Sequence, residues 1–169
     1  MTLPKEIREI IEKLEKAGYE GYAVGGCVRD LLLKELALSK VEGPKDWDVT
    51  TNAKPEEIQK IFPDNIYENT FGTVGVKTGS EDPALALVEV TPYRIEGKYT
   101  DKRHPDEVKF ADKLEDDLSR RDFTVNTMAL GADGRVIDLF NGQGDLKNKI
   151  VRTVGGPNER FGEDALRML

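Results

Sequence analysis

A short apolar strand, a glycine pair and a helix follow one another near the start of the chain, and this order constrains the fold most. Tyr22-Ala23-Val24 predicts a strand, Gly25-Gly26 follows at once, and helical apolar spacing continues from Val28 to about Leu38. Glycines at such a turn let main-chain N–H groups approach an anion, and the helix N-terminus adds a favourable potential. Arg29, one turn into this helix, can place a guanidinium on the same anion. Alone, these features indicate only a tight turn and a solvated arginine.

A pair of aspartates, Asp46 and Asp48, lies in the next predicted strand. Because side chains alternate along a strand, both carboxylates are expected on the same face. Magnesium is bound through one or two carboxylates together with substrate phosphates. In an acidic chain, an Asp-x-Asp pair by itself is better explained as two surface residues of an edge strand. The glycine turn and Arg29 upstream make a metal site the better interpretation. Together they predict a phosphate site beside a magnesium site.

A further carboxylate, Glu89, lies between Val88 and Val90 in a later predicted strand. Alternation places it on the face opposite the two valines. It is a candidate third carboxylate of the metal site. An ordinary outward-facing residue of a half-buried strand explains the pattern equally well, so both interpretations stay open.

The remaining patterns predict an α+β fold. Helical apolar spacing occurs over residues 4–17, after Pro55, and over 114–118, 125–130 and 160–169. Strand patterns occur over residues 71–77 and 84–91, which form a predicted hairpin, and over 136–139. Residues 92–107 form a long charged connection without periodicity, and connections of this length tend to be functional.

Composition narrows the possible functions. The net charge of −7 argues against a tight grip on nucleic acid by this chain alone, because phosphate binding draws on clustered Lys and Arg. One cysteine, Cys27, and one histidine, His104, cannot build a Cys/His zinc site, so any metal must be held by oxygen. No apolar run approaches the roughly 18 residues of a membrane span. The N-terminus also lacks the features of a secretory signal, so a cytoplasmic location is expected.

Six short motifs occur in one order between about Tyr22 and Leu169. They are Gly25-Gly26-Cys27-Val28-Arg29-Asp30, Lys45-Asp46-Trp47-Asp48, Glu89-Val90-Thr91-Pro92-Tyr93-Arg94, Arg120-Arg121-Asp122-Phe123-Thr124-Val125-Asn126, Asp138-Leu139 with Gly144-Asp145-Leu146, and Glu163-Asp164-Ala165-Leu166-Arg167. This series resembles the class II tRNA nucleotidyltransferases, or CCA-adding enzymes, and the related bacterial poly(A) polymerases. The resemblance implies a polymerase-β-like nucleotidyltransferase head, a mixed sheet with flanking helices, over residues 1–140. Residues 141–169 would then be the start of a helical neck, which is truncated.

The resemblance implies an enzyme that transfers CMP and AMP from CTP and ATP to the 3′ end of tRNA without a nucleic-acid template. Carried over onto this sequence, Asp46 and Asp48 match the magnesium ligands, and the nucleotide contacts match Gly25, Gly26, Arg29, Arg121 and Asp122. Asp164 and Arg167 match the pair that reads the incoming base. At i and i+3 of a helix these two would face the same way, and a carboxylate acceptor beside a guanidinium donor can imitate a base edge. An intrahelical ion pair is the alternative role.

The mechanism expected from these residues is two-metal nucleotidyl transfer. Asp46 and Asp48 would hold Mg²⁺ ions, of which one activates the RNA 3′-hydroxyl and both stabilise charge on the α-phosphate, and Glu89 is a candidate third carboxylate. Cys27 is expected to be a packed residue and not a nucleophile, and His104 a loop residue and not a base.

Several features bear on the substrate. Residues 94–107, with Asp101, Arg103 and Pro105, resemble the flexible loop of enzymes that add the terminal A. Two departures from the family stand out: a long segment between Asp30 and Asp46, and the absence of the parts after Leu169 that would hold tRNA, so tRNA binding is expected to be weak. A poly(A) polymerase stays an alternative, as does a nucleotide-binding head fragment without activity of its own. The sequence gives no indication of oligomeric state.

Overall fold

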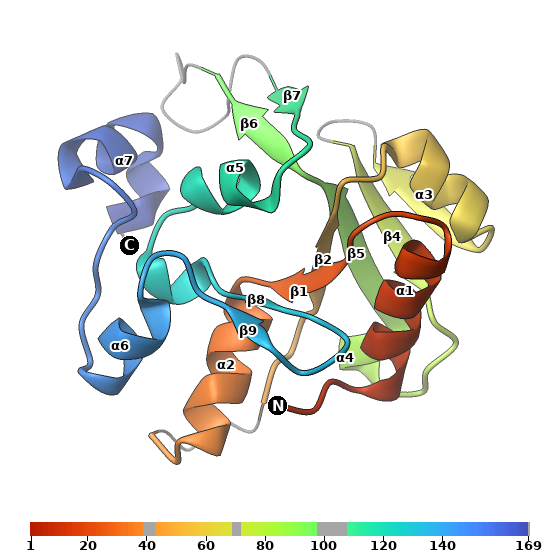
Figure 1. The fold of residues 1–169 in the computed structure, drawn as a ribbon, viewed down its shortest axis with the longest axis horizontal. Coiled ribbons are helices and arrows are strands. Elements are labelled where there is room, and N and C mark those ends of the chain that lie inside the picture. The colour runs from red at the N-terminus through yellow and green to blue at the C-terminus, as the bar shows by residue number, and fades with distance from the viewer. Residues whose placement is uncertain (39–42, 69–71, 98–107, 169) are drawn as a thin grey trace.

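The computed structural model describes residues 1–38, 43–68, 72–97 and 108–168 (Figure 1). Within these residues, seven strands form one mixed sheet in the order β3-β4-β5-β2-β1-β8-β9. These strands are β1 (Tyr22–Val24), β2 (Asp48–Thr51), β3 (Asn65–Glu68), β4 (Thr73–Lys77), β5 (Leu87–Pro92), β8 (Ala129–Leu130) and β9 (Val136–Ile137). β2 and β5 pair in parallel, and the other neighbours pair antiparallel. β6 (Arg94–Glu96) and β7 (Val108–Phe110) form a separate two-stranded ribbon.

Helices flank this sheet, and the described residues also contain two short 3₁₀ segments. The helices are α1 (Lys5–Lys16), α2 (Gly26–Glu35), α3 (Pro55–Ile61), α4 (Pro83–Ala86), α5 (Leu114–Ser119), α6 (Gly142–Lys147) and α7 (Pro157–Glu163), and the 3₁₀ segments are Thr124–Asn126 and Ala165–Met168. α1 confirms the predicted first helix, because the apolar residues that recur at helical spacing are all buried: Ile7, Ile10, Ile11 and Leu14. α3 begins with Pro55 as predicted, and its Glu57 carboxylate accepts a hydrogen bond from the Lys54 main-chain N at 2.7 Å.

The two faces of the sheet are covered differently. Side chains of α1, α2 and α3 pack on one face against the strands, as Ile11, Val28, Ile58, Val49 and Val90 show in one continuous core. On the other face a smaller cluster joins α5 to β1 and β8, and it contains Val24, Tyr93, Leu114, Leu118 and Ala129. The Asp48 side chain lies on the second face, because side chains alternate along β2 and that of its neighbour Val49 points into the core on the first face. The Asp48 side chain therefore projects from the face of the sheet that α5 covers, opposite the face that α1 covers.

The predicted hairpin is present, but its second strand begins only at Leu87, because residues 84–86 belong to the connecting helix α4. β4 and β5 pair antiparallel, with Val76 opposite Val88. Pro83 lies in the first turn of α4, and the Asp82 side chain accepts a hydrogen bond from the Ala84 main-chain N at 2.9 Å. The loop between the strands thus closes through a capped helical turn.

Two predicted helices are wrong. Residues 125–130 instead contain a 3₁₀ turn that ends at Asn126 and then β8, because Ala129 pairs with Val24 of β1 and tertiary pairing overrides local spacing. The predicted helix over 160–169 is broken at Asp164, which has extended φ and ψ values of −137° and 112°. Its side chain accepts a hydrogen bond from the Leu166 main-chain N at 2.9 Å, a local bond that competes with helix continuation.

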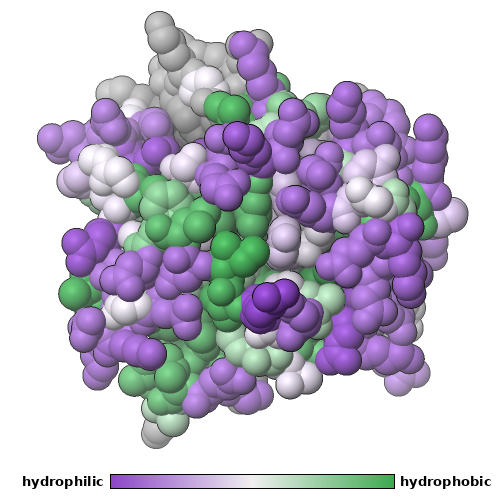
Figure 2. Space-filling model, in the orientation of Figure 1, coloured by the Kyte–Doolittle hydropathy of each residue, from purple (hydrophilic) through white to green (hydrophobic). Residues whose placement is uncertain are grey.

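α6 lies against the rest of the molecule, since its Leu146 packs in the main core. The division into a head over 1–140 and a neck over 141–169 stays a prediction. No helix in the described ranges combines the length and the apolar character needed to cross a bilayer. Figure 2 shows hydrophilic side chains over most of one face, with an apolar band through its middle.

Candidate active site

The glycine turn after β1 sets the start of α2. Gly25 has φ of 85° and ψ of −138°, a conformation that essentially only glycine adopts, and α2 begins at the next residue. The Gly25 main-chain N donates to the Met128 carbonyl at 3.4 Å, which ties the turn to the segment before β8. The first turn of α2 lines a pocket of about 340 Å³, whose residues are Gly26, Cys27, Arg29, Asp30, Gly43, Lys45, Asp46 and Asp48. The structure therefore brings the predicted phosphate turn and both predicted metal ligands into one pocket.

The two aspartates face this pocket from the start of β2. Asp48 is the first residue of the strand, whereas Asp46 lies in the bend before it, so the prediction that both are in a strand is wrong for Asp46. The intervening Trp47 is buried at 4% exposure, while Asp46 is exposed and Asp48 half-buried. Both carboxylates line the same pocket, and the charge of Asp46 acts on Asp48, so the two lie on one side of the chain as predicted.

The electrostatics of Asp48 suit a cation. Burial raises the pKa of Asp48 above its ordinary value, the positive charge of Arg121 opposes this, and the neighbouring Asp46 raises the pKa further. A divalent cation between the two carboxylates would offset both the burial and the repulsion. The donor set is all oxygen, which is what Mg²⁺ prefers, and substrate phosphates can complete it. The residues present therefore fit a divalent cation.

Arg121 lies directly over the glycine turn. A Cβ atom built on Gly25 would come within 3.2 Å of Arg121 Nη1 and within 3.9 Å of Asp48 Oδ2. Gly25 thus leaves room for the guanidinium beside the Asp48 carboxylate. Residues almost a hundred positions apart in the sequence meet here, as the predicted nucleotide site requires.

A buried carboxylate, Asp117 of α5, holds the two arginines of this segment. Its Oδ1 accepts hydrogen bonds from Arg120 Nε at 3.0 Å and Nη2 at 2.8 Å, and its Oδ2 accepts one from Arg121 Nη2 at 3.3 Å. Thr50 of β2 also donates to it through Oγ1 at 3.3 Å. Burial by itself would raise the pKa of Asp117, but the charges and hydrogen bonds of Arg120 and Arg121 outweigh it, and the pKa lies below its ordinary value. We did not expect Asp117 from the sequence, although its position three and four residues before two arginines is the available signal.

Asp122 acts on the pocket through another residue. Its Oδ1 accepts hydrogen bonds from the Phe123 main-chain N at 2.6 Å and from Asn126 Nδ2 at 3.1 Å. The Asn126 Oδ1 in turn accepts a hydrogen bond from Arg29 Nη1 at 2.8 Å, and Arg29 Nε donates to Asp30 at 2.8 Å. Arg29 is therefore held from two sides, and Asn126 is a second site residue that spacing alone did not single out.

Cys27 is a packed residue, as expected. It is 3% exposed, and its Sγ donates to the Val24 carbonyl at 3.2 Å. Burial raises the pKa of the Cys27 thiol to about 11, which disfavours the nucleophilic thiolate.

Glu89 is a neighbour of Asp48 in the sheet. The parallel register of β2 and β5 places the two residues opposite one another, and the buried Val88 and Val90 confirm that Glu89 faces the other way. In the part of the chain that the structure describes, no three acidic, His or Cys side chains gather closely enough to hold one ion. A metal-binding role for Glu89 stays a prediction.

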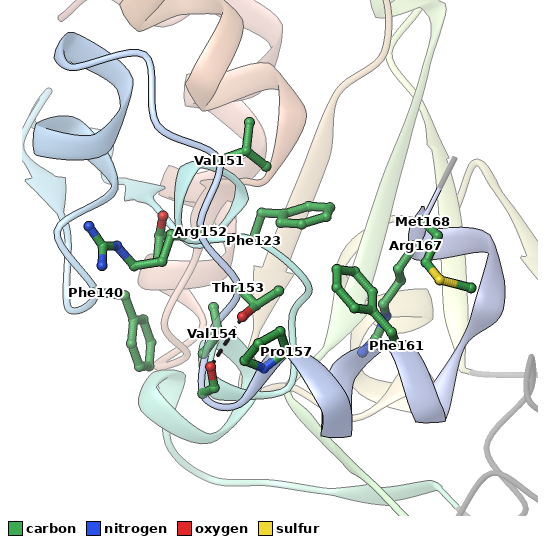
Figure 3. A pocket seen from close by; sticks show the side chains of 12 residues that line it. Phe123, Phe140, Val151, Arg152, Thr153, Val154, Pro157, Phe161, Arg167 and Met168 are labelled. Atoms are coloured by element: carbon green, nitrogen blue, oxygen red, sulfur yellow. Dashed lines mark hydrogen bonds between the residues drawn. The ribbon is translucent and has the colours of Figure 1, made fainter.

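The predicted base-reading residues lie outside the 340 Å³ pocket. Arg167 lines a separate groove of about 850 Å³ between the segments 151–157 and α7, together with Phe123, Phe161 and Met168 (Figure 3). Arg167 Nη1 donates to Glu163 Oε2 at 2.6 Å, so Arg167 forms an ion pair with Glu163. Because α7 ends before Asp164, the expectation that Asp164 and Arg167 lie in one helix is wrong. The Arg167 main-chain N still donates to the Asp164 carbonyl at 3.2 Å, and a common orientation of the two side chains stays a prediction. The resembling loop residues Asp101, Arg103, His104 and Pro105 lie outside the described residues.

Substituting Gly25 tests the contact between the turn and Arg121. Gly25→Ala forces alanine into a backbone conformation that costs about 1–3 kcal/mol of stability. Its methyl group also presses on the Arg121 guanidinium. We expect a lower free energy of unfolding and CTP binding weakened by about tenfold or more. Urea denaturation and calorimetric titration measure the two effects.

Gly18→Ala is the matched control, because Gly18 has φ of 91° but nothing lies within 4 Å of its Cβ position. It should lose stability and keep CTP binding. Equal CTP affinities in the two variants would contradict the proposed contact.

Comparison with known proteins places this geometry in a family. Residues 21–152 match the poly A polymerase head domain. The CCA-adding enzyme of Oceanobacillus iheyensis is 48% identical over 161 residues, which cover 95% of this chain and 37% of that enzyme. The crystal structure of Bacillus stearothermophilus CCA-adding enzyme in complex with CTP has a TM-score of 0.80 at 38% identity, covering 98% of this chain and 38% of that one. A tRNA nucleotidyltransferase complexed with a primer tRNA and an incoming ATP analogue has a TM-score of 0.69 at 28% identity, covering 94% and 42%.

The chain spans little more than a third of the length of the curated relatives that it matches. The mixed sheet with flanking helices is shared with the CCA-adding enzyme structure, which confirms the predicted fold class. The matched range contains the glycine turn, both aspartates and Arg121. The chain therefore belongs to the poly A polymerase head domain family, as its resemblance to the class II tRNA nucleotidyltransferases predicted.

Proposed function

We propose that this chain is the catalytic head of a CCA-adding enzyme, which transfers CMP and AMP from CTP and ATP to the 3′ end of tRNA in the cytoplasm. The observation that carries the proposal is the convergence of Gly25, Asp48 and Arg121 at one place, although they come from three distant motifs. Relatives at 44–48% identity are named CCA-adding enzymes, and they supply the substrate class. The remainder of those enzymes would contribute most of the contacts to tRNA.

The pocket residues would divide the work between the nucleotide and the metal. Asp46 and Asp48 would hold the divalent cations, for which we propose Mg²⁺, and the N-terminus of α2 with Arg29 would bind the triphosphate. Bound there, the metal would polarise the α-phosphate and make the attacking hydroxyl more acidic. Arg121 lies against Gly25 and Asp48, so it would bind the phosphate chain beside the cation.

The reaction forms a bond between the RNA 3′-oxygen and the α-phosphorus and breaks the bond from the α-phosphorus to the oxygen that bridges to the β-phosphate. Arg29 and Arg121 would bind the pyrophosphate that leaves, because each carries a fixed positive charge beside the pocket. The proton of the attacking hydroxyl would pass to water beside the Asp46 and Asp48 carboxylates, whose negative charge favours its removal. The chain thus stabilises charge and orients the reactants without forming a covalent intermediate.

We further propose that Asp164 and Arg167 read the incoming base. Both side chains already have partners nearby: Arg167 donates to Glu163 and to the Arg160 main-chain carbonyl, and Asp164 accepts from the Leu166 main chain. Base reading would require them to exchange or share these partners with the nucleotide.

A poly(A) polymerase is the second candidate, because the matching family is named for that activity. Incubation of the chain with Mg²⁺, a tRNA that lacks its terminal CCA and either ATP alone or CTP with ATP separates the candidates. CCA addition predicts CMP incorporation followed by a single AMP, and it predicts loss of the product after chelation with EDTA. A long tail from ATP alone would identify a poly(A) polymerase. Magnesium-dependent CTP binding without incorporation would leave a nucleotide-binding head that needs the rest of the enzyme.

A further inference from the structure

One arginine of α7, Arg160, is bound to two other segments of the chain. Its Nε donates to the Val154 carbonyl at 2.8 Å, and its Nη1 donates to the Arg120 carbonyl at 3.2 Å. Nη1 also contacts Glu163 Oε2 at 3.0 Å on its own helix. The side chain is only 17% exposed, so these contacts are shielded from water.

The two carbonyls that Arg160 contacts belong to the segments 120–124 and 152–154, which main-chain hydrogen bonds join. The Val154 main-chain N donates to the Asp122 carbonyl at 2.9 Å, and the Thr124 main-chain N donates to the Arg152 carbonyl at 2.8 Å. Arg160 therefore anchors α7 to the segment that carries Arg121. Because Arg121 follows Arg120 directly, the anchor lies one residue from the proposed phosphate contact.

The Arg160 guanidinium is also linked, through Glu163, to Arg167, the proposed base-reading residue. Glu163 Oε2 accepts from both Arg160 Nη1 at 3.0 Å and Arg167 Nη1 at 2.6 Å. The Arg160 main-chain carbonyl accepts a second bond from Arg167 Nη1 at 3.3 Å. The position of Arg167 is thus defined relative to Arg160 by a side chain and by the main chain.

We infer that Arg160 is a positioning residue that fixes Arg167 relative to Arg121, so that the base contact and the phosphate contact keep a set separation. The inference rests on the proposed nucleotide site. Arg160 need not touch the nucleotide, and its effect passes through Glu163 on one side and the Arg120 main chain on the other. It predicts a loss confined to nucleotides with a base, because phosphate groups alone do not reach Arg167.

Lysine at position 160 separates geometry from charge. Lysine keeps the positive charge but has one nitrogen, so it cannot reproduce a fork that donates through Nε and Nη1 to different segments. Glu163→Gln leaves both carbonyl contacts of Arg160 in place and weakens the two ion pairs of Glu163, one with Arg160 and one with Arg167. The two variants therefore interrupt the same connection at different points.

The test is calorimetric titration of the 169-residue chain with CTP and, separately, with inorganic tripolyphosphate, both with Mg²⁺. We expect Arg160→Lys and Glu163→Gln each to weaken CTP binding by about tenfold and to leave tripolyphosphate binding within about twofold. Arg135→Gln is the control, because it removes an exposed arginine whose ion pair with Asp133 lies in the β8–β9 connection.

Each outcome decides the inference. Wild-type CTP affinity in Glu163→Gln, or equal losses for CTP and tripolyphosphate in a folded Arg160→Lys, would overturn it. If Arg160→Lys fails to fold, Glu163→Gln alone decides. A wild-type chain that binds neither CTP nor tripolyphosphate would instead refute the proposed nucleotide site.

Discussion

Replacing Asp48 with asparagine should lower CMP incorporation on the order of a thousandfold, because a lost metal ligand removes several kcal/mol of transition-state stabilisation and about 1.4 kcal/mol corresponds to a factor of ten. Folding should not suffer. The burial and the neighbouring Asp46 that raise the pKa of Asp48 both penalise its charged form in the folded chain. Asparagine keeps the shape and removes the charge, so the midpoint of thermal unfolding should stay equal or rise.

The matched control for this substitution is Asp64→Asn. Asp64 is a largely exposed carboxylate that pairs with Lys77 at 3.3 Å, at the edge of the sheet formed by β3 and β4. It should change neither incorporation nor magnesium-dependent CTP binding. Full activity in Asp48→Asn would refute the metal assignment, and a large fall in its unfolding midpoint would show that the carboxylate serves the fold instead.

The largest loss of stability is expected for Asp117→Asn. Asp117 is fully buried and pairs with Arg120 and Arg121, whose side chains are 16% and 20% exposed. Breaking a buried pair by removing one partner costs about 3–5 kcal/mol, because the remaining charges stay without compensation. CTP binding should also weaken, since Arg121 is no longer held beside Gly25.

The pH dependence of Asp117→Asn follows from linkage. The pKa of Asp117 is below its ordinary value of 3.8 in the folded chain, so its charged form stabilises the fold. This contribution is complete above the pKa of the unfolded chain and is lost as the pH falls through the lower folded pKa. The difference in free energy of unfolding between wild type and Asp117→Asn should therefore be largest near neutral pH and shrink below about pH 4. A difference that does not change between pH 7 and pH 3 would contradict the ionic role.

Much of the fold could be predicted because local patterns and tertiary contacts agree in several elements. In α1 every apolar position at helical spacing is buried, and in the β4–β5 hairpin the valines alternate as the sheet requires. The secondary-structure predictions are wrong where strand pairing or a side-chain hydrogen bond overrides the local helical pattern. β8 replaces a predicted helix because Ala129 has a partner in β1, and the last helix breaks because Asp164 bonds its own backbone. Neither partner is visible in a local window of sequence.

The centre of the candidate site was predictable for a different reason. The glycine turn, Asp48 and Arg121 each belong to a motif whose chemistry needs the others, so their meeting could be expected before the structure was known. Asp117 and Asn126 could not be found in this way, because they contact other site residues rather than a substrate. The separation of Arg167 from the pocket depends on the path of α7, which no pattern in the sequence specifies.

The hydrogen bond from Gly25 to Met128 also bears on the order of folding. It joins residues roughly a hundred positions apart, and a contact of this span forms only after a large loop has closed. α1 and the β4–β5 hairpin can form earlier, since their own contacts are local. The proposed nucleotide site is therefore complete only once the segment before β8 has docked on the glycine turn, and a bound nucleotide would stabilise only the completed fold.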